Sequence, residues 1–313
     1  MREYFCLAFF SILVCSLSAC VTSQTEQPKF KTEILQYQSE SRGEVKPVIA
    51  LVTTPLSAQR PLPVVITQHG SNRDGMSFPG GEGKTDEYSS RLIKEGTRRG
   101  FAVVALDAFY KTSIKPSDKR KFPNAFQYAL DLKDILVNDP RFDGKNIFFT
   151  GFSYGASQVN KSISSKVNYG QVPWRAVASV EPGCNIIFEP IKVPFSLLMI
   201  KGSESHYYVE PCQFYIKLLK SSGNDASLTI IDGANHFFST DGRITNGIAV
   251  NGCRYNPVIR KTDGSTVFAD GTTATRKLIT ERCITKEAGS GKNRVHLDKV
   301  IDQVLTFFET HRI

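Results

Sequence analysis

Metal-binding and nucleic-acid-binding motifs are both missing from this sequence of 313 residues. There is no Cys-x-x-Cys pair, so the seven cysteines lack the spacing of a zinc site. The net charge is +9, but the lysines and arginines are scattered, with only short clusters such as Lys119-Arg120-Lys121. No motif of an RNA- or DNA-binding domain accompanies them. We therefore expect a mildly cationic, solvated surface and no nucleic-acid partner.

The apolar run near the N-terminus, Phe5–Leu17, is too short to span a bilayer comfortably. It follows an arginine and has the character of a signal-peptide core. It ends in Leu17-Ser18-Ala19-Cys20, which resembles the lipobox of bacterial lipoproteins, where the cysteine is acylated and becomes the new N-terminus. We expect residues 1–19 to be a lipoprotein signal peptide, Cys20 the lipidated residue and residues 20–29 a polar tether. An ordinary signal peptide with an incidental cysteine is the alternative.

A lipid anchor on Cys20 would make the membrane a partner and place the protein in the bacterial cell envelope. Val21 after the cysteine, in place of an aspartate, fits the outer membrane, facing the periplasm or the exterior. Such a compartment is oxidising, and an even number of cysteines remains for disulfides. Four cysteines allow three pairings, and we favour Cys184–Cys212 with Cys253–Cys283.

Strand-like and helix-like segments alternate along the rest of the chain. Apolar, β-branched segments predict strands at Phe30–Tyr37, Val45–Thr53, Pro63–Gly70, Phe101–Asp107, Lys145–Thr150, Ala176–Val180, Phe195–Ile200 and Ser227–Ile231. Helices are predicted at Asp86–Arg99, Asn124–Val137, Ser153–Val167, Val209–Ser221 and Val295–His311. The alternation predicts an α/β fold, with a mostly parallel central sheet and helices on both faces, as one domain over residues 30–313. An irregular, disulfide-containing insertion is expected at about 239–293.

The segment Gly151-Phe152-Ser153-Tyr154-Gly155 has the pattern of a nucleophile elbow. An apolar strand precedes this Gly-x-Ser-x-Gly sequence and a helix-forming stretch follows it. In such an elbow a sharp turn exposes the serine, and the flanking glycines avoid collisions with the neighbouring strand and helix. The pattern therefore predicts Ser153 as a nucleophile.

A serine hydroxyl needs an adjacent base, which a third group orients. His236 lies just beyond the last predicted strand and is the expected base, with a structural histidine as the alternative. Glu204 is the carboxylate in the loop after Phe195–Ile200 and is the expected acid, with a solvated surface glutamate as the alternative. Asp232 and Asp107 are less favoured candidates for the acid.

An oxyanion hole needs two backbone N–H groups that point at the developing charge. The first is expected from Tyr154, which follows the nucleophile, and the second from Ser71, which follows the predicted strand Pro63–Gly70. The candidate nucleophile, base, acid and oxyanion donors together predict acyl transfer through a covalent acyl-enzyme intermediate. Such chemistry needs neither a metal nor an organic cofactor.

Together these motifs resemble the α/β-hydrolase superfamily and, within it, the dienelactone hydrolase-like group of secreted bacterial enzymes. The resemblance spans residues 45–310 and rests on Gln68-His69-Gly70-Ser71, Gly151–Gly155, Glu181-Pro182-Gly183-Cys184, Gly202–Cys212 and Gly233–Phe238. It implies an α/β-hydrolase fold and a serine hydrolase that acts on a small carboxylic ester. A peptidase or acyltransferase with the same triad, or a non-catalytic binding lipoprotein, is the alternative.

Members of this group also carry a Pro-Gly-Cys segment after the strand that follows the elbow, and they pair it with a cysteine beyond the acid loop. This implies the Cys184–Cys212 disulfide. The chain departs from the group at two positions. Ser153 stands where dienelactone hydrolases have cysteine, which argues against a muconate-lactone substrate. Glu204 stands where the group usually has aspartate.

Overall fold

The computed structural model describes residues 30–164, 172–240, 248–250, 252–286 and 291–313. The predicted signal peptide, the lipidated Cys20 and the polar tether lie outside these residues, as does the predicted end of a helix at Val167. Among the helices of the described ranges, none is both long and apolar enough to cross a membrane.

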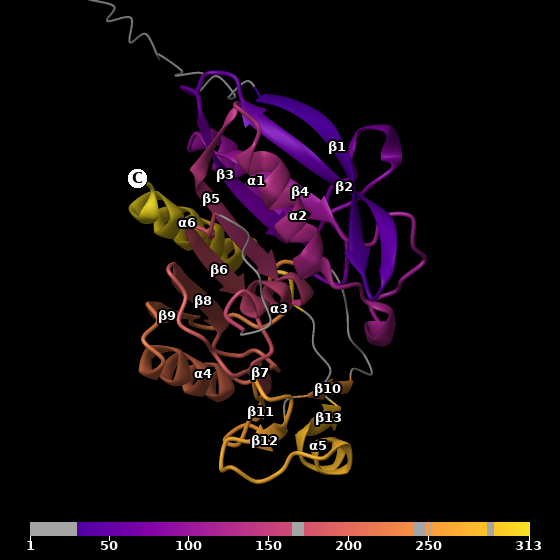
Figure 1. The fold of residues 1–313 in the computed structure, drawn as a ribbon, viewed down its shortest axis with the longest axis vertical. Helices are drawn as coiled ribbons and strands as arrows, with labels where there is room; N and C mark the ends of the chain where they lie inside the picture. The colour runs from indigo at the N-terminus through magenta and orange to yellow at the C-terminus, as the bar shows by residue number, and fades with distance from the viewer. Residues whose placement is uncertain (1–29, 165–171, 241–247, 251, 287–290) are drawn as a thin grey trace, which may run out of the picture.

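A central sheet of eight strands has the order β1-β2-β4-β3-β5-β6-β8-β9 (Figure 1). Its strands are β1 (Phe30–Ser41), β2 (Glu44–Pro55), β3 (Leu62–Gln68), β4 (Ala102–Asp107), β5 (Phe142–Phe152), β6 (Ala176–Val180), β8 (Ser196–Gly202) and β9 (Ala226–Ile231). β2 is antiparallel to both β1 and β4, and the other neighbouring strands are parallel. The mostly parallel sheet is confirmed. β2 lies between β1 and β4.

The central strands are buried on both faces because their side chains alternate between two cores. In β3, which is buried along its whole length, Val64 and Ile66 belong to one core and Val65 to the other. A continuous apolar, β-branched run is what such a strand requires. The carboxyl ends of these parallel strands meet at one edge of the sheet, where ligands bind in open α/β sheets.

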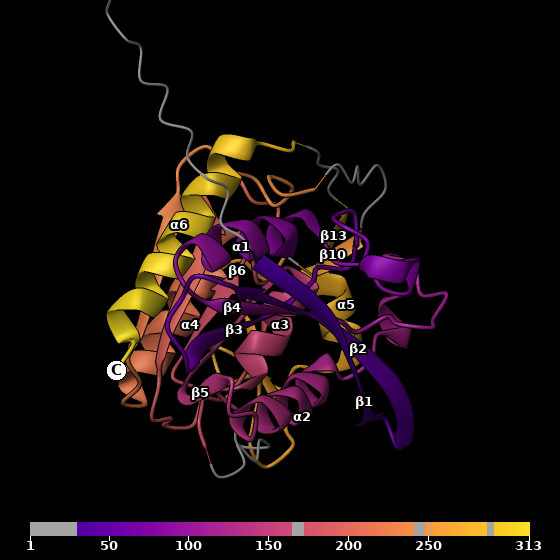
Figure 2. The same cartoon turned by 90° about the horizontal axis from the view of Figure 1, so that it is seen from above.

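Helices cover both faces of the sheet, as Figure 2 shows for α6 and α2. The helices are α1 (Glu87–Arg98), α2 (Ala125–Val137), α3 (Tyr154–Lys161), α4 (Val209–Ser221), α5 (Arg276–Cys283) and α6 (Arg294–His311), with 3-10 turns at Pro79–Gly81 and Lys119–Lys121. Apolar side chains of α1 and α6 share one core, and those of α2, α3 and α4 share the other. The predicted layering of helices on both faces is confirmed.

Local sequence explains where the first helix begins and ends. The Asp86 carboxylate caps α1 by accepting a hydrogen bond of 2.9 Å from the Ser89 backbone N–H. Gly100 follows the helix with a φ of +83°, a left-handed conformation that glycine adopts without strain. By contrast, the helix predicted to run from Ser153 to Val167 is observed as α3, which ends earlier, at Lys161.

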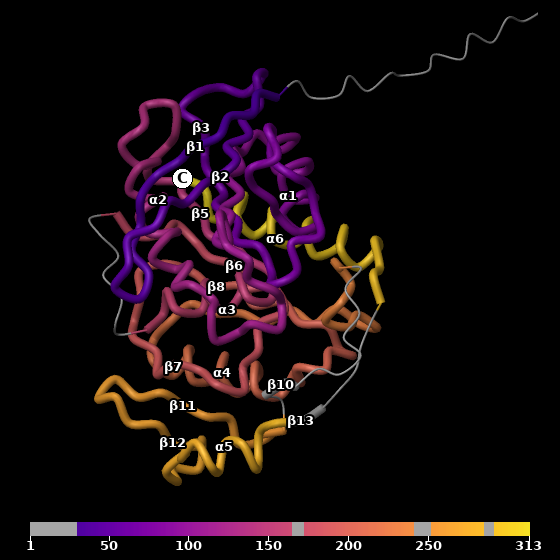
Figure 3. Tube along the Cα trace, turned by 90° about the vertical axis from the view of Figure 1, so that its right-hand side faces the viewer, coloured from indigo at the N-terminus to yellow at the C-terminus, as the bar shows by residue number. Residues whose placement is uncertain are grey.

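The segment predicted to be irregular, 239–293, contains secondary structure of its own. It holds β10 (Ile248–Val250), β11 (Val258–Arg260), β12 (Thr266–Phe268), α5 and β13 (Ile284–Lys286). The predicted Cys253–Cys283 disulfide is confirmed, and both cysteines belong to a small core of this segment. β11 pairs in parallel with β7 (Ile186–Phe188), a strand that the sequence analysis missed. Figure 3 shows β11, β12 and α5 beyond β7 at one end of the molecule.

Candidate active site

The segment with the Gly-x-Ser-x-Gly pattern forms a sharp turn between β5 and α3. Ser153 lies directly between the two elements, with φ 53° and ψ −104°. A non-glycine residue in this left-handed region is strained. A Cβ atom on Gly155 would lie 2.0 Å from the Gln68 carbonyl oxygen, and one on Gly151 would lie 2.5 Å from the Gly155 carbonyl carbon. Both glycines are therefore required by the close approach of backbone to backbone.

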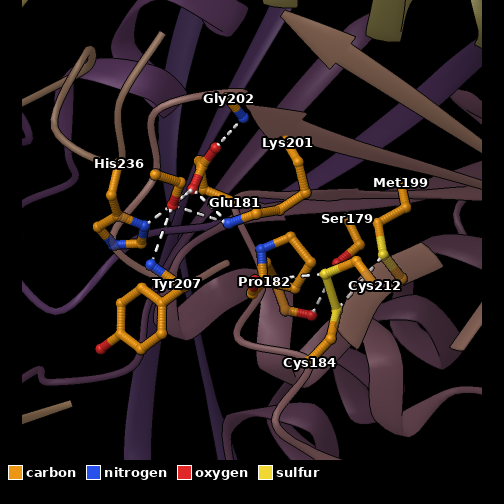
Figure 4. The surroundings of a disulfide bond; sticks show 12 residues. Ser179, Glu181, Pro182, Cys184, Met199, Lys201, Gly202, Tyr207, Cys212 and His236 are labelled. Atoms are coloured by element: carbon orange, nitrogen blue, oxygen red, sulfur yellow. Dashed lines mark hydrogen bonds and ion pairs between the residues drawn. A yellow bond between two sulfur atoms is a disulfide. The ribbon is translucent and has the colours of Figure 1, made fainter. Parts of the chain in front are cut away.

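The turn brings the predicted nucleophile to the predicted base. The Ser153 Oγ atom lies 3.0 Å from Nε2 of His236, which is buried in the loop after β9. The other ring nitrogen, Nδ1, lies 3.0 Å from Oε2 of Glu181. Figure 4 shows the Glu181 carboxylate between His236 and the end of β8. The three side chains form one continuous hydrogen-bonded chain from serine to carboxylate.

The predicted acid, Glu204, is therefore wrong, because the carboxylate beside His236 belongs to Glu181. Glu204 is exposed, and its backbone N–H donates to the Ala234 carbonyl oxygen. The physical reason lies in the strand order. Glu181 follows β6, which pairs directly with the strand that carries the elbow, whereas Glu204 follows β8, one strand further away.

The two other carboxylates considered as acids also lie outside the site. Asp107 accepts hydrogen bonds of 2.8 Å from Arg73, and Asp232 is exposed. The sequence did contain a signal for Glu181. It is the first residue after a correctly predicted buried strand, at the edge where the parallel strands end.

Four donors hold the Glu181 carboxylate, which is fully buried. Oε1 accepts from the Gly202 N–H, and Oε2 accepts from Lys201, Ser205 and His236. Burial alone would raise the pKa of this carboxyl, but the Lys201 ammonium and then His236 lower it to about 2. Glu181 is therefore a carboxylate at every pH at which the protein is expected to work.

Burial keeps the imidazole of His236 neutral. It lowers the pKa of His236 below the ordinary value of 6.5, although the Glu181 carboxylate opposes this effect. A second imidazole, His206, lies edge-on to His236 with 5.0 Å between ring centroids, and burial lowers its pKa to about 3. Near neutral pH, both rings are uncharged, and Nε2 of His236 can accept a proton from Ser153.

Hydrogen bonds fix the loop that precedes Ser71. The Gly70 N–H donates to Oδ2 of Asp86 at 2.6 Å, so this N–H is engaged within the protein. Nδ1 of His69 lies 2.6 Å from the Gly70 carbonyl oxygen, while its Nε2 accepts from the Ala108 N–H at 3.1 Å. His69 thus supports the loop through both ring nitrogens, and the Ser71 N–H remains the predicted oxyanion donor of this loop.

The side chain of Tyr154, the other predicted oxyanion residue, is engaged in contacts within the protein. Its hydroxyl donates to the Pro123 carbonyl oxygen at 2.7 Å, and its ring stacks on Phe109 with 5.4 Å between centroids. The backbone of Tyr154 begins α3, where N–H groups are unpaired within the helix. The role predicted for Tyr154 concerns that N–H alone.

The predicted Cys184–Cys212 disulfide is confirmed, with an S–S distance of 2.02 Å. It joins the segment after Glu181 to α4, as Figure 4 shows. The bridge therefore ties the segment that follows Glu181 to α4. In the part of the chain that the structure describes, no three His, Cys, Asp or Glu side chains are grouped so that they could hold a metal ion.

No protein-family model matches the chain, and no curated protein matches it significantly. Similar solved structures include a dienelactone hydrolase-like promiscuous phosphotriesterase from metagenomic libraries, which is 15% identical, covers 66% of this chain and 84% of its own, and has a TM-score of 0.48. An esterase of Pyrobaculum calidifontis is 18% identical, covers 66% of this chain and 78% of its own, and has a TM-score of 0.48. Esterase 2 of Thermogutta terrifontis is 13% identical, covers 66% of this chain and 85% of its own, and has a TM-score of 0.49. The strand order and the sharp turn at Ser153, independently of these similarities, show that this chain has the α/β-hydrolase fold.

Proposed function

We propose that the protein is a serine hydrolase that cleaves carboxylic esters through an acyl-enzyme intermediate. The observation that carries this proposal is the hydrogen-bonded chain Ser153–His236–Glu181, in which both links measure 3.0 Å. The strained turn at Ser153 adds support, because backbone strain of this kind is concentrated at functional sites. A protein that only binds a ligand has no need for an ordered serine, imidazole and carboxylate.

In the proposed reaction, Oγ of Ser153 attacks the ester carbonyl carbon while Nε2 of His236 takes the hydroxyl proton. Glu181 accepts the hydrogen bond from Nδ1 and stabilises the imidazolium that forms. Backbone N–H groups of Ser71 and Tyr154 stabilise the negative charge on the carbonyl oxygen. His236 then protonates the departing alkoxide. A water molecule next attacks the acyl carbonyl carbon while Nε2 of His236 takes its proton, and His236 returns this proton to Oγ of Ser153 as the carboxylic acid leaves.

A fluorophosphonate probe tests this proposal on the purified protein. We expect one covalent adduct per chain, located on Ser153 by peptide mapping. A panel of p-nitrophenyl esters and aminoacyl p-nitroanilides separates an esterase from a peptidase, and added glycerol as acceptor detects acyl transfer. A folded protein that forms no adduct, or one labelled at another residue, contradicts the proposal and favours a binding lipoprotein.

We propose further that this hydrolase is anchored to the cell envelope through lipid on Cys20, on the basis of the lipobox-like Leu17-Ser18-Ala19-Cys20. Metabolic labelling with radioactive palmitate in a bacterial host tests it. We expect label in the full-length chain, loss of label in Cys20→Ser, and retention of label in the control Cys15→Ser. Equal labelling of the two variants would refute lipidation at Cys20.

A further inference from the structure

A buried lysine, Lys201, lies beside the carboxylate of the site, and the reaction steps above leave it without a role. Its side chain is 0% exposed, and its Nζ atom lies 2.7 Å from Oε2 of Glu181. The two residues lie side by side because β6 and β8 pair in register up to Val180 and Ile200, the residues that immediately precede them. Lys201 and Glu181 therefore face each other at the same strand ends (Figure 4).

Ser205 closes a triangle with this pair. The Lys201 ammonium donates to Oγ of Ser205 at 2.9 Å, and the Ser205 hydroxyl donates to Oε2 of Glu181 at 2.8 Å. The oxygen that orients His236 thus accepts from a cation, a hydroxyl and the imidazole at once. Its position is fixed from three sides.

Full burial of a lysine is rare, because the ammonium loses its hydration. An apolar side chain of similar volume would fill the same space without this cost, so packing alone does not explain Lys201. Its charge has two effects on its neighbours. It favours the ionised form of the Glu181 carboxyl and so opposes burial, which raises the pKa of that group. It also disfavours protonated His236, and so adds to the effect of burial on that pKa.

We propose that Lys201 is a positioning residue: its ammonium keeps Glu181 as a fixed carboxylate beside His236 and thereby extends the activity of the site to lower pH. The role in activity rests on the proposed function, whereas the charge relations within the site do not. Lys201 acts through Glu181 and His236.

Three other titratable groups in the described part of the chain act on this pair or lie beside it: His206, Tyr207 and Lys119. His206 lies on the loop after β8 and stays neutral above about pH 3. The Tyr207 ring lies 6.0 Å from Nζ of Lys201 and 4.8 Å from the His236 ring. Lys119, from the 3-10 turn at Lys119–Lys121, adds positive charge that lowers the pKa of both histidines. None of these three groups is a carboxylate that could replace Glu181.

The kinetic test measures kcat/KM for p-nitrophenyl acetate as a function of pH in the wild type and in Lys201→Met. The wild type is expected to lose activity only below pH 6.5, because burial and Lys201 both lower the pKa of the base. Removal of the ammonium takes away this repulsion, so protonated His236 becomes more stable. The acid limb in Lys201→Met should therefore move to higher pH by about one unit or more.

Two further variants separate charge from packing and from hydrogen bonding. Lys201→Gln keeps a hydrogen-bond donor without the charge, and we expect its acid limb to shift as in Lys201→Met. Lys133→Met is the matched control, since Lys133 is a second buried lysine, on α2, whose Nζ donates to the Val172 carbonyl oxygen at 2.7 Å. It should lose stability without a shift of the acid limb. A limb that stays in place in both Lys201 variants would overturn the proposal.

An NMR titration provides a readout that does not depend on turnover. In wild-type protein with labelled lysine and histidine, we expect Lys201 to be a charged ammonium between pH 5 and 8, and Nδ1 of His236 to keep its proton throughout. A neutral Lys201 at pH 7 would overturn the proposal even if no variant folds. If the fluorophosphonate probe fails while these signals appear as expected, only the proposed function is refuted.

Discussion

Replacement of Ser153 with alanine is expected to lower kcat for ester hydrolysis by about a millionfold. The variant lacks the atom that becomes acylated, so only substrate binding and the oxyanion donors remain. These leave a residual acceleration of roughly 10³-fold over the reaction in water. Steady-state kinetics measure the loss of kcat, and burst kinetics with p-nitrophenyl acetate measure acylation. The wild type should release one equivalent of p-nitrophenol in the first turnover, and Ser153→Ala should show no burst.

Ser157 provides the matched control for this variant. It lies one turn further along α3, is exposed, and donates from its hydroxyl to the Ser153 carbonyl oxygen at 3.3 Å. Ser157→Ala should therefore retain kcat within about twofold, because surface substitutions of this kind have small effects. If Ser153→Ala kept more than a hundredth of the wild-type kcat, Ser153 would not be the nucleophile.

Replacement of Glu181 with glutamine is expected to lower kcat by about 10⁴-fold. The amide can donate to Nδ1 of His236, which selects the imidazole tautomer that carries its proton on Nε2. That tautomer cannot accept the proton of Ser153, and the imidazolium loses its neighbouring negative charge. Steady-state kinetics at pH 8 measure the loss. Glu204→Gln, the control at the acid first predicted, should remain within about twofold of the wild type, because its side chain is exposed.

Glu181→Gln should also destabilise the fold, because it leaves the Lys201 ammonium buried without its carboxylate. Breaking a buried ion pair in this way costs about 3–5 kcal/mol. The double variant Glu181→Gln/Lys201→Met should recover most of this loss in urea unfolding but none of the activity. A large loss of kcat in Glu204→Gln, with normal kcat in Glu181→Gln, would reinstate the acid predicted from sequence.

Local sequence patterns were sufficient to predict the sheet, most of the helices and the elbow. The β-branched run that became β3, for example, could be assigned because burial on both faces requires an unbroken apolar segment. The meeting of Ser153 and His236 was likewise predictable, because both follow strands of one parallel sheet. This prediction depends only on the order of the strands and helices along the chain, and not on which strands are neighbours in the sheet.

The acid required knowledge of spatial neighbours, which the chain order does not give. Glu181 and Glu204 both follow buried strands, and only the pairing of β6 with β5 brings Glu181 beside the elbow. The short strand β7 was missed for a related reason. Its partner β11 starts at Val258, far along the chain, and three residues are too few to show a period of two.

The left-handed backbone at Ser153 recurs at Glu181, where φ is 55°. Non-glycine residues in such conformations each cost on the order of 1–3 kcal/mol. Two of them consume a noticeable part of the roughly 5–15 kcal/mol by which a domain is stable. Relief of the strain at these two positions by substitution would therefore remove the nucleophile or the acid. Selection for thermostability in this chain would have to act on other residues, away from the ends of β5 and β6.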